Sequence, residues 1–398
     1  MNDIAIVGGG IVGGAAALAL SAAFPGRVVH IAPKASGDER TTALLNDAVD
    51  LLRAVGVWRA VEESSSALRT MRLLDGSRRL IRSRPVEFHA SEVGLEAFGY
   101  NVRNDVLTTA LAETEGPRRV EATVDRVERT DVGWFLELSN GDTHAVDAVI
   151  GADGRNSIVR EAAGIGTRRW SYPQVALVTT FAHDRPHMNV STEFHTETGP
   201  LTQVPLPARE DAPHRSSLVW VVRPEQVDRQ TQLSTAVLSD EIAERTGFLL
   251  GGVRAEAPLT GYPLVGLVAK RFGADGAFLV GEAAHVFPPI GAQGANLGFR
   301  DVADCVDAMR TNENVVRASE VYDRKRSADI HARTAMVDVL NRSLLTGLLP
   351  VQMGKALGTQ ALAASGPLRR FAMRWGLSPS PDRYAGNGST GNVPAVMK

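Results

Sequence analysis

The chain opens with an apolar run followed by closely spaced glycines. Residues 4–7 read Ile-Ala-Ile-Val, and the next residues read Gly8-Gly-Gly10-Ile-Val-Gly13. A buried strand that passes through Gly-x-Gly-x-x-Gly into a helix is the usual dinucleotide-binding arrangement. Gly8 permits the tight turn, Gly10 leaves room for a pyrophosphate, and Gly13 lets the helix pack closely on the strand. This opening predicts a Rossmann-like α/β domain, but it does not separate FAD from NAD.

The end of the expected second strand lacks the acid that usually accompanies such a fingerprint. Residues 27–31 form an apolar stretch, and Ala32 and Pro33 come next. In dinucleotide sites an Asp or Glu at this position holds the ribose hydroxyls. The nearest acids are Asp38 and Glu39. This departure counts against NAD and leaves one ribose contact without an assigned residue.

A glycine- and proline-rich run between Gly281 and Asp301 is the second constraint. It follows a strand-like stretch, residues 276–280, and leads into a helix-like stretch, residues 292–309. Backbone N–H groups at the start of a helix point in one direction, and the helix dipole adds positive potential there. Such a crossing suits an anion, or a ring that becomes anionic when it is reduced.

A third strand–turn–helix corner lies in the middle of the chain. Residues 147–151 are strand-like, and Asp153 and Gly154 follow before a helix begins. Asp153 can accept a hydrogen bond from a sugar, and Arg155 and Arg160 can pair with phosphate. Taken alone, this corner is better explained as an ordinary turn.

With the three motifs in this order, the chain resembles the class A flavoprotein aromatic monooxygenases, most closely the hydroxylases of ubiquinone biosynthesis. The opening matches their fingerprint for the ADP part of FAD, and residues 151–160 match their Asp-Gly motif. Residues 40–44 and 56–58 resemble their early helix, and the likeness covers residues 1–345. Residues 281–301 match their Gly-Asp motif and its following signature, through Pro289, Gln293, Gly294, Asn296, Gly298 and Asp301.

The resemblance also implies which residues hold the cofactor. In the family's late motif Asp is usual where this chain has Glu282, and His is frequent where it has Pro288. The cofactor-binding residues implied are Gly8, Gly10, Gly13, Arg40, Asp153, Gly154, Gly281, Glu282, Gly291, Gln293, Gly294 and Asn296. The catalytic segment implied comprises Pro289, Gly294, Ala295 and Asn296. The N–H groups of residues 291–296 would stabilise negative charge on the reduced flavin, and the prolines would shape the face beside the substrate.

The activity implied by the resemblance is flavin-dependent hydroxylation. NAD(P)H would visit transiently to reduce FAD, and O₂ would supply the oxygen added to an electron-rich aromatic ring. The cofactor carries this chemistry, while the protein positions it and excludes water. No single acid or base is assigned, and the substrate implied is a polyprenyl phenol or a related aromatic.

Composition is consistent with an enzyme that acts on small molecules. The formal net charge is −2, which argues against nucleic-acid binding. Cys305 is the single cysteine, so neither a disulfide framework nor a multi-cysteine zinc site is expected. His183, His187 and His195 lack a carboxylate pattern that would indicate a metal site. The N-terminus has no basic region before its apolar stretch, so a cytoplasmic protein without a signal peptide is expected.

The expected fold class is α/β, with a Rossmann-like FAD-binding domain interleaved with a β-sheet substrate domain and followed by a C-terminal helical region. At 398 residues the chain exceeds one typical domain. The expected segments are 1–68, 104–172 and 262–317 for the FAD-binding domain, 69–103 and 173–261 for the substrate domain, 318–377 for the C-terminal helices, and 378–398 for a flexible tail.

Three alternatives stay open. The C-terminal helices, which carry Arg369, Arg370 and Arg374, either pack on the FAD domain, which is favoured, or meet a membrane or other biosynthesis proteins. Trp220 and Phe194 either line a substrate pocket or pack inward, and inward packing is favoured. The rivals to a monooxygenase are another flavin oxidoreductase on the same fold, and a non-catalytic FAD-binding subunit of a ubiquinone-biosynthesis assembly.

Overall fold

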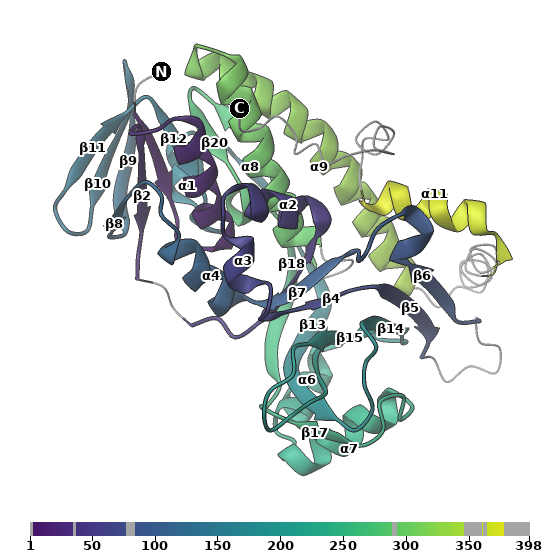
Figure 1. The fold of residues 1–398 in the computed structure, drawn as a ribbon. Coiled ribbons are helices and arrows are strands. Elements are labelled where there is room, and N and C mark those ends of the chain that lie inside the picture. The colour runs from purple at the N-terminus through teal and green to yellow at the C-terminus, as the bar shows by residue number, and fades with distance from the viewer. Residues whose placement is uncertain are drawn as a thin grey trace.

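A six-stranded sheet forms the centre of the first domain (Figure 1). The computed structural model describes residues 3–34, 37–76, 84–288, 293–345, 360 and 364–377. The strand order is β19 (Gly273–Ala274), β20 (Ala277–Leu279), β12 (Ala148–Gly151), β1 (Ile4–Val7), β2 (Val28–Ala32) and β8 (Arg118–Glu121). All neighbours are parallel except β19 and β20. The central strands are fully buried, which explains their continuous apolar sequences.

Helices supply the rest of this core. They are α1 (Ile11–Ala23), α2 (Asn46–Ala54), α3 (Trp58–Val61), α4 (Asn104–Glu113), α5 (Ile158–Ala162), α8 (Gln293–Thr311) and α9 (Val315–Leu345). α1 packs against α8, and α9 packs against α8 in turn (Figure 1). A three-stranded meander, β9 (Val124–Thr130), β10 (Gly133–Leu138) and β11 (Thr143–Val146), adds Trp134 and Leu136 to the same core. The α/β class expected from the sequence is confirmed.

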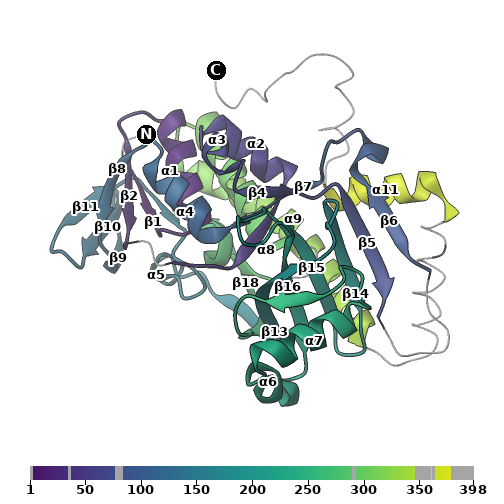
Figure 2. The same cartoon turned by 60° about the horizontal axis from the view of Figure 1, so that its bottom comes forward.

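The second domain is built on a nine-stranded sheet. Its strands are β21 (His285–Val286), β18 (Thr260–Ala269), β13 (Thr167–His183), β16 (Arg215–Val222), β15 (Pro200–Leu206), β14 (Val190–His195), β5 (Thr70–Asp75) and β6 (Val86–His89), with β17 (Val253–Ala255) beside β13. α6 (Pro224–Thr231) and α7 (Thr235–Arg245) lie at the end of the molecule away from the N-terminus (Figure 2). Trp220 and Phe194 belong to the core that α7 covers, so inward packing is correct for both.

A small sheet joins the two domains. It consists of β3 (Thr41–Leu45), β7 (Gly99–Arg103) and β4 (Ser65–Ala67). The resemblance suggested an early helix at residues 40–44, which is wrong: this stretch is β3, and α2 begins only at Asn46. Thr41 and Thr42 are β-branched, which favours an extended backbone.

β13 and β18 are longer than the sequence suggested. β13 runs across the expected boundary at 172/173, and β18 runs across the one at 261/262. At the Thr167 end β13 contributes Trp170 to the first core, and further along it contributes Leu177 and Phe181 to the second. Each long strand therefore belongs to both domains.

Of the C-terminal helices, α9 packs on α8 of the FAD domain, as the sequence favoured, whereas α11 (Gly366–Leu377) packs on the second domain. Met373 is buried with Phe98 and Ala90, and Arg369 forms a two-pronged ion pair with Glu92 of the 3-10 turn η1 (Ala90–Val93). Figure 1 shows α11 beside β5 and β6. Residues 346–359 and 378–398 lie outside the described part. None of the helices in the described ranges combines the length and apolarity needed to cross a membrane.

Candidate cofactor and substrate site

The fingerprint glycines occupy three different environments. Gly8 has a φ of +125°, and an ideal Cβ there would lie 2.2 Å from the carbonyl oxygen of Ala152. A Cβ on Gly13 would lie 2.2 Å from the carbonyl oxygen of Gly8. A Cβ on Gly10 would meet no atom within 4 Å. Gly8 and Gly13 therefore make the turn possible, whereas Gly10 borders open space.

A buried histidine supports the same turn, and sequence reasoning did not identify it. His30 on β2 lies with Nε2 2.9 Å from the carbonyl oxygen of Gly8. Burial lowers the pKa of His30, so its ring is neutral and Nε2–H donates to this carbonyl. The backbone N–H of Gly8 donates to Ile31 O at 2.9 Å. The end of β2 thus fixes the turn through both a side chain and the backbone.

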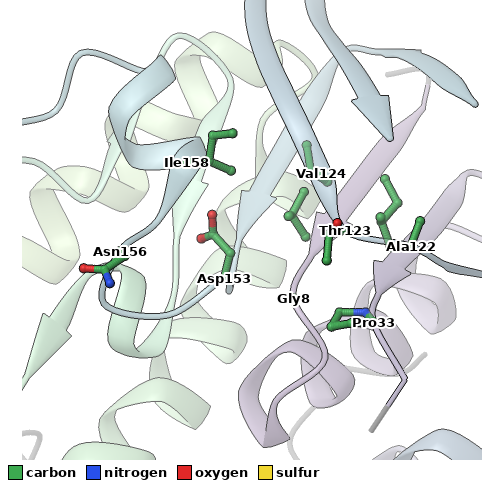
Figure 3. A pocket seen from close by; sticks show the side chains of 10 residues that line it. Gly8, Pro33, Ala122, Thr123, Val124, Asp153, Asn156 and Ile158 are labelled. Atoms are coloured by element: carbon green, nitrogen blue, oxygen red, sulfur yellow. The ribbon is translucent and has the colours of Figure 1, made fainter. Parts of the chain in front are cut away.

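A pocket with a volume of about 300 Å³ opens beside this turn (Figure 3). It lies where β1, β2 and β12 end, and the chain order of the sheet reverses at β1. In open parallel sheets this is where ligands bind. Its walls are formed by Val7, Gly8, Ile31, Pro33, Ala122, Thr123, Val124, Asp153, Asn156 and Ile158.

Asp153 provides the carboxylate of this pocket wall. Its Oδ2 accepts from the N–H of Val159 at 3.2 Å. Its Oδ1 is buried and has no hydrogen-bond partner among the described residues. A buried acceptor without a partner is costly, and a ribose hydroxyl or an ordered water would satisfy it. This orphaned oxygen fits a nucleotide in the pocket.

The acids nearest the end of β2 are engaged elsewhere. Asp38 accepts from Arg40 at 2.8 and 2.7 Å and from the Asn104 amide at 2.9 Å. Burial opposes the charge of Asp38, but the hydrogen bonds from Arg40 and Asn104 prevail and lower its pKa. Ala32 is fully buried, with its Cβ 3.0 Å from the position of a Cβ on Gly9. The end of β2 therefore packs against the turn and supplies no carboxylate.

Arg155 and Arg160, which were considered as phosphate ligands, contact other protein groups in the structure. Arg160 is almost fully buried and donates to the carbonyl oxygens of Ala283 at 2.7 Å and Arg155 at 2.9 Å. It therefore ties the second motif to the third. Arg40 stacks over the ring of Tyr262 at 5.1 Å while it pairs with Asp38. Glu282 is half exposed and lies 3.6 Å from Arg155.

The first turn of α8 carries the late motif. Pro289 and Gly291 lie outside the described residues. A Cβ on Gly294 would meet no atom within 4 Å, so open space borders the start of this helix. The Asn296 side chain accepts from Leu45 N at 2.8 Å and donates to Ala43 O at 2.8 Å. This residue thus holds β3 against α8, and its side chain is not free to bind a ligand through these atoms.

β3 also reaches the second sheet. The hydroxyl of Thr41 donates to that of Ser217 at 3.1 Å, and Ser217 lies on β16. Between Leu201 and Pro205 of β15 buried residues alternate with half-buried ones, whereas β16 is buried except at Val219. Leu201 and Trp220 are in the core that α7 covers. The half-buried residues on the other face include Thr202, Val204 and Val219. This face is apolar with a few hydroxyls, and it lies toward the FAD domain.

The candidate histidines have other partners. His183 contacts Arg185 O and the Ser216 hydroxyl, and His195 contacts Glu193. Across the described ranges no group of His, Cys, Asp and Glu is arranged to hold a metal ion. Cys305 is buried, and burial raises the pKa of its thiol, so it is a packed core residue.

Comparison with known proteins decides the family. Residues 1–326 match the family model described as FAD binding domain. Ubiquinone hydroxylase UbiL of Rhodospirillum rubrum is 32% identical over 96% of this chain and 92% of its own length. The 3-demethoxyubiquinol 3-hydroxylase of Escherichia coli is 32% identical over 94% and 98%. The chain belongs to the FAD-dependent aromatic monooxygenases.

Solved structures agree with the fold of this monooxygenase. The p-nitrophenol 4-monooxygenase PnpA of Pseudomonas putida superposes with a TM-score of 0.74 at 16% identity, covering 95% of this chain and 98% of its own. HpxO of Klebsiella pneumoniae, in complex with FAD and uric acid, gives 0.74 at 16% identity, covering 95% and 97%. FAD is the cofactor of this family, and NAD(P)H is the reductant typical of the class.

Proposed function

We propose that this monooxygenase hydroxylates the ring of a polyprenylated phenol in ubiquinone biosynthesis. The main support is sequence similarity, over almost the whole chain, to two relatives whose names state ubiquinone and demethoxyubiquinol hydroxylation. The half-buried sheet face near Thr202, Val204 and Val219 supports the proposal, because an apolar surface suits a substrate with a hydrocarbon chain. The fold and the FAD site alone do not distinguish among aromatic substrates.

The residues of this chain would divide the work between binding and orientation. The fingerprint turn and Asp153 would hold the ADP part of FAD, and the start of α8 would lie near the flavin. When bound, FAD supplies the redox chemistry that activates O₂. α8 begins at Gln293, and the N–H groups of a first helical turn point along the axis at the positive end of the helix dipole. They would stabilise negative charge on the reduced ring.

Peripheral attachment of a cytoplasmic protein to a membrane is part of the proposal. On α11, Leu368 is 43% exposed and Phe371 is 67% exposed. Arg370 and Arg374 are exposed on the same helix. Apolar side chains flanked by arginines suit a membrane with anionic lipids that carries a prenylated substrate. Sedimentation with anionic vesicles should fall for F371S and for R370Q/R374Q. Equal binding of these variants and the original protein would contradict this part.

Product analysis tests the function. The holoenzyme is incubated with NADH or NADPH, ¹⁸O₂ and a panel of prenylated phenols, and products are analysed by mass spectrometry. The proposal predicts one ¹⁸O in the ring of at least one prenylated phenol, with a higher kcat/KM than for the same phenol without its chain. NAD(P)H consumption without labelled product across the panel would contradict it. Failure of both reductants to reduce the bound flavin would favour the non-catalytic subunit.

A further inference from the structure

Asp301, on α8, joins the two ends of the late motif. Its side chain is fully buried. Oδ2 accepts from the backbone N–H of Gly281 at 2.9 Å and lies 2.7 Å from Nε2 of His285. Oδ1 accepts from Nε of Arg326 on α9 at 2.7 Å. Gly281 is the first residue of the 3-10 turn η2 (Gly281–Ala283) that follows β20, and His285 lies just after this turn, so one carboxylate ties the turn to α8.

A network of paired charges, with Asp301 and Arg326 at its buried centre, surrounds this carboxylate. Arg326 also donates to Asp304 at 3.1 Å and to Asp329 at 2.8 Å. Lys325 lies 2.9 Å from Asp304, and Arg333 lies 2.8 Å from Asp329. Lys325, whose side chain is 43% exposed, also lies 3.1 Å from Asp307, so this end of the network reaches the surface. Charges as deeply buried as those at its centre are stable only when they are paired.

The contact with Asp301 determines which ring nitrogen of His285 donates a hydrogen bond. A carboxylate that pairs with Arg326 accepts hydrogen bonds, so Nε2 of His285 is the nitrogen that donates to Asp301. The His285 side chain is fully buried, and its Nδ1 has no partner among the described residues.

We propose that Asp301 is a positioning residue for the cofactor, and that Arg326 holds it in place. Asp301 belongs to the helix whose first turn would face the flavin, and it fixes the turn that ends β20. Without it, the Gly281 N–H and the His285 ring would lose their acceptor, and the two sides of the motif would be free to separate. The inference rests on the FAD site and not on the identity of the substrate, so a failed substrate assay would leave it intact.

The test compares two asparagine substitutions made to the same cluster. D301N removes the carboxylate that contacts Gly281 and His285. D304N is the matched control, since Asp304 contacts Arg326 and Lys325 but neither of those two residues. Both should lower the midpoint of urea unfolding of the apoprotein. D301N should weaken FAD binding about tenfold or more, as expected for a charge-assisted hydrogen bond, and D304N less than about twofold.

A second readout excludes a purely structural role. D301N leaves the Arg326 cation without its main partner, so the midpoint potential of bound FAD should rise because the reduced, anionic ring is favoured. R326K keeps the charge but loses the fork of donors, and its FAD affinity should fall between those of D301N and the original protein. Should D301N not fold, R326K carries the test. The proposal is overturned if FAD affinity and potential in D301N, or FAD affinity in R326K, change no more than in D304N.

Discussion

Gly298 packs directly against Val12, which lies 286 residues earlier in the chain: a Cβ on Gly298 would lie 2.5 Å from Cγ2 of Val12. A Cβ on Gly281 would lie 3.2 Å from Cγ1 of the same valine. Val12 on α1 therefore fills the space that these two glycines of the late motif leave open. The fingerprint and the late motif form one packed unit, and the glycine at 298 serves helix packing instead of ligand contact.

Replacing Gly10 should remove FAD without unfolding the protein. A Cβ on Gly10 would meet no protein atom within 4 Å, and its backbone is extended with φ −73° and ψ 176°. G10V should therefore leave the unfolding temperature of the apoprotein nearly unchanged while its side chain blocks the pyrophosphate approach. Visible absorbance of the purified protein measures the flavin content. G13A is the contrasting variant, because its Cβ collides with Gly8 and should lower both stability and binding. Full flavin content in G10V would contradict the assignment of the pocket.

Asp153 offers a test of the free oxygen in the pocket wall. In D153N the amide oxygen can still accept from the Val159 N–H, which leaves the amide NH₂ group where an acceptor stood. We expect FAD affinity to fall about tenfold, the effect of one lost charge-assisted hydrogen bond, while the apoprotein keeps its stability. Titration of apoprotein with FAD, followed by flavin fluorescence, measures this. An unchanged dissociation constant would show that Oδ1 does not contact the nucleotide.

A negative charge at the start of α8 should have opposite effects on the apoprotein and the reduced holoenzyme. Ala295 lies in the first helical turn, where an acid stabilises the helix by about 0.3–1 kcal/mol. A295D should thus retain or raise apoprotein stability, yet slow flavin reduction and lower the flavin potential by opposing negative charge on the ring. A295N has the same volume without the charge and serves as control. If both variants behave alike, the start of α8 does not act on the flavin through charge.

Docking of α11 should depend on acidity. Hydrogen bonds from Arg369 lower the pKa of Glu92 below its ordinary value. A carboxylate with a lowered pKa in the folded state contributes stability above its unfolded pKa of about 4.3, and this contribution is lost as the pH falls through the folded value. E92Q should therefore destabilise the protein at pH 7 and have a vanishing effect in strong acid. Urea unfolding across this range measures the difference.

The control for that experiment is E96Q. Glu96 pairs with Arg69 at 3.2 Å, but its side chain is 75% exposed. Pairs of this kind contribute little. E96Q should show almost no effect at either pH, and a pH-independent effect of E92Q would mean that the pair with Arg369 does not hold α11.

The parts of the fold that were predictable from the sequence are those with local signals. The strand-like stretch 276–280 contains β20, and the helix-like stretch 292–309 corresponds to α8 from Gln293 onward. Buried parallel strands are continuous apolar runs, so β1 and β12 were recognisable. Asp153 and Gly8 line the pocket at the ends of β12 and β1, where the strand–turn–helix corners were recognisable from their turn residues.

The contacts that were missed depend on residues far apart in the chain. Nothing near Asn296 indicates that its amide would bind β3, since Ala43 and Leu45 offer only backbone groups. Arg160 was considered for phosphate pairing, but it donates to backbone carbonyl oxygens. Any residue can supply such an oxygen, so the sequence around Arg160 does not reveal these partners. His30 and Arg326 carry no local pattern that marks them as supports of a turn or a carboxylate. Such roles are fixed by tertiary packing.

The pairing of β13 with β18 has a mechanical consequence. The two strands are paired from Thr167 with Ala269 to Val178 with Thr260, and the register shifts once, between Ser171 and Val175. A ladder of backbone hydrogen bonds resists stretching and shear but yields to twisting where its regularity is broken. The paired strands β13 and β18 thus form a rigid connection between the two domains, and the register shift between Ser171 and Val175 is the one place along this pairing where the connection bends easily. Any widening of the space between flavin and substrate sheet should concentrate its backbone rotations at residues 171–175.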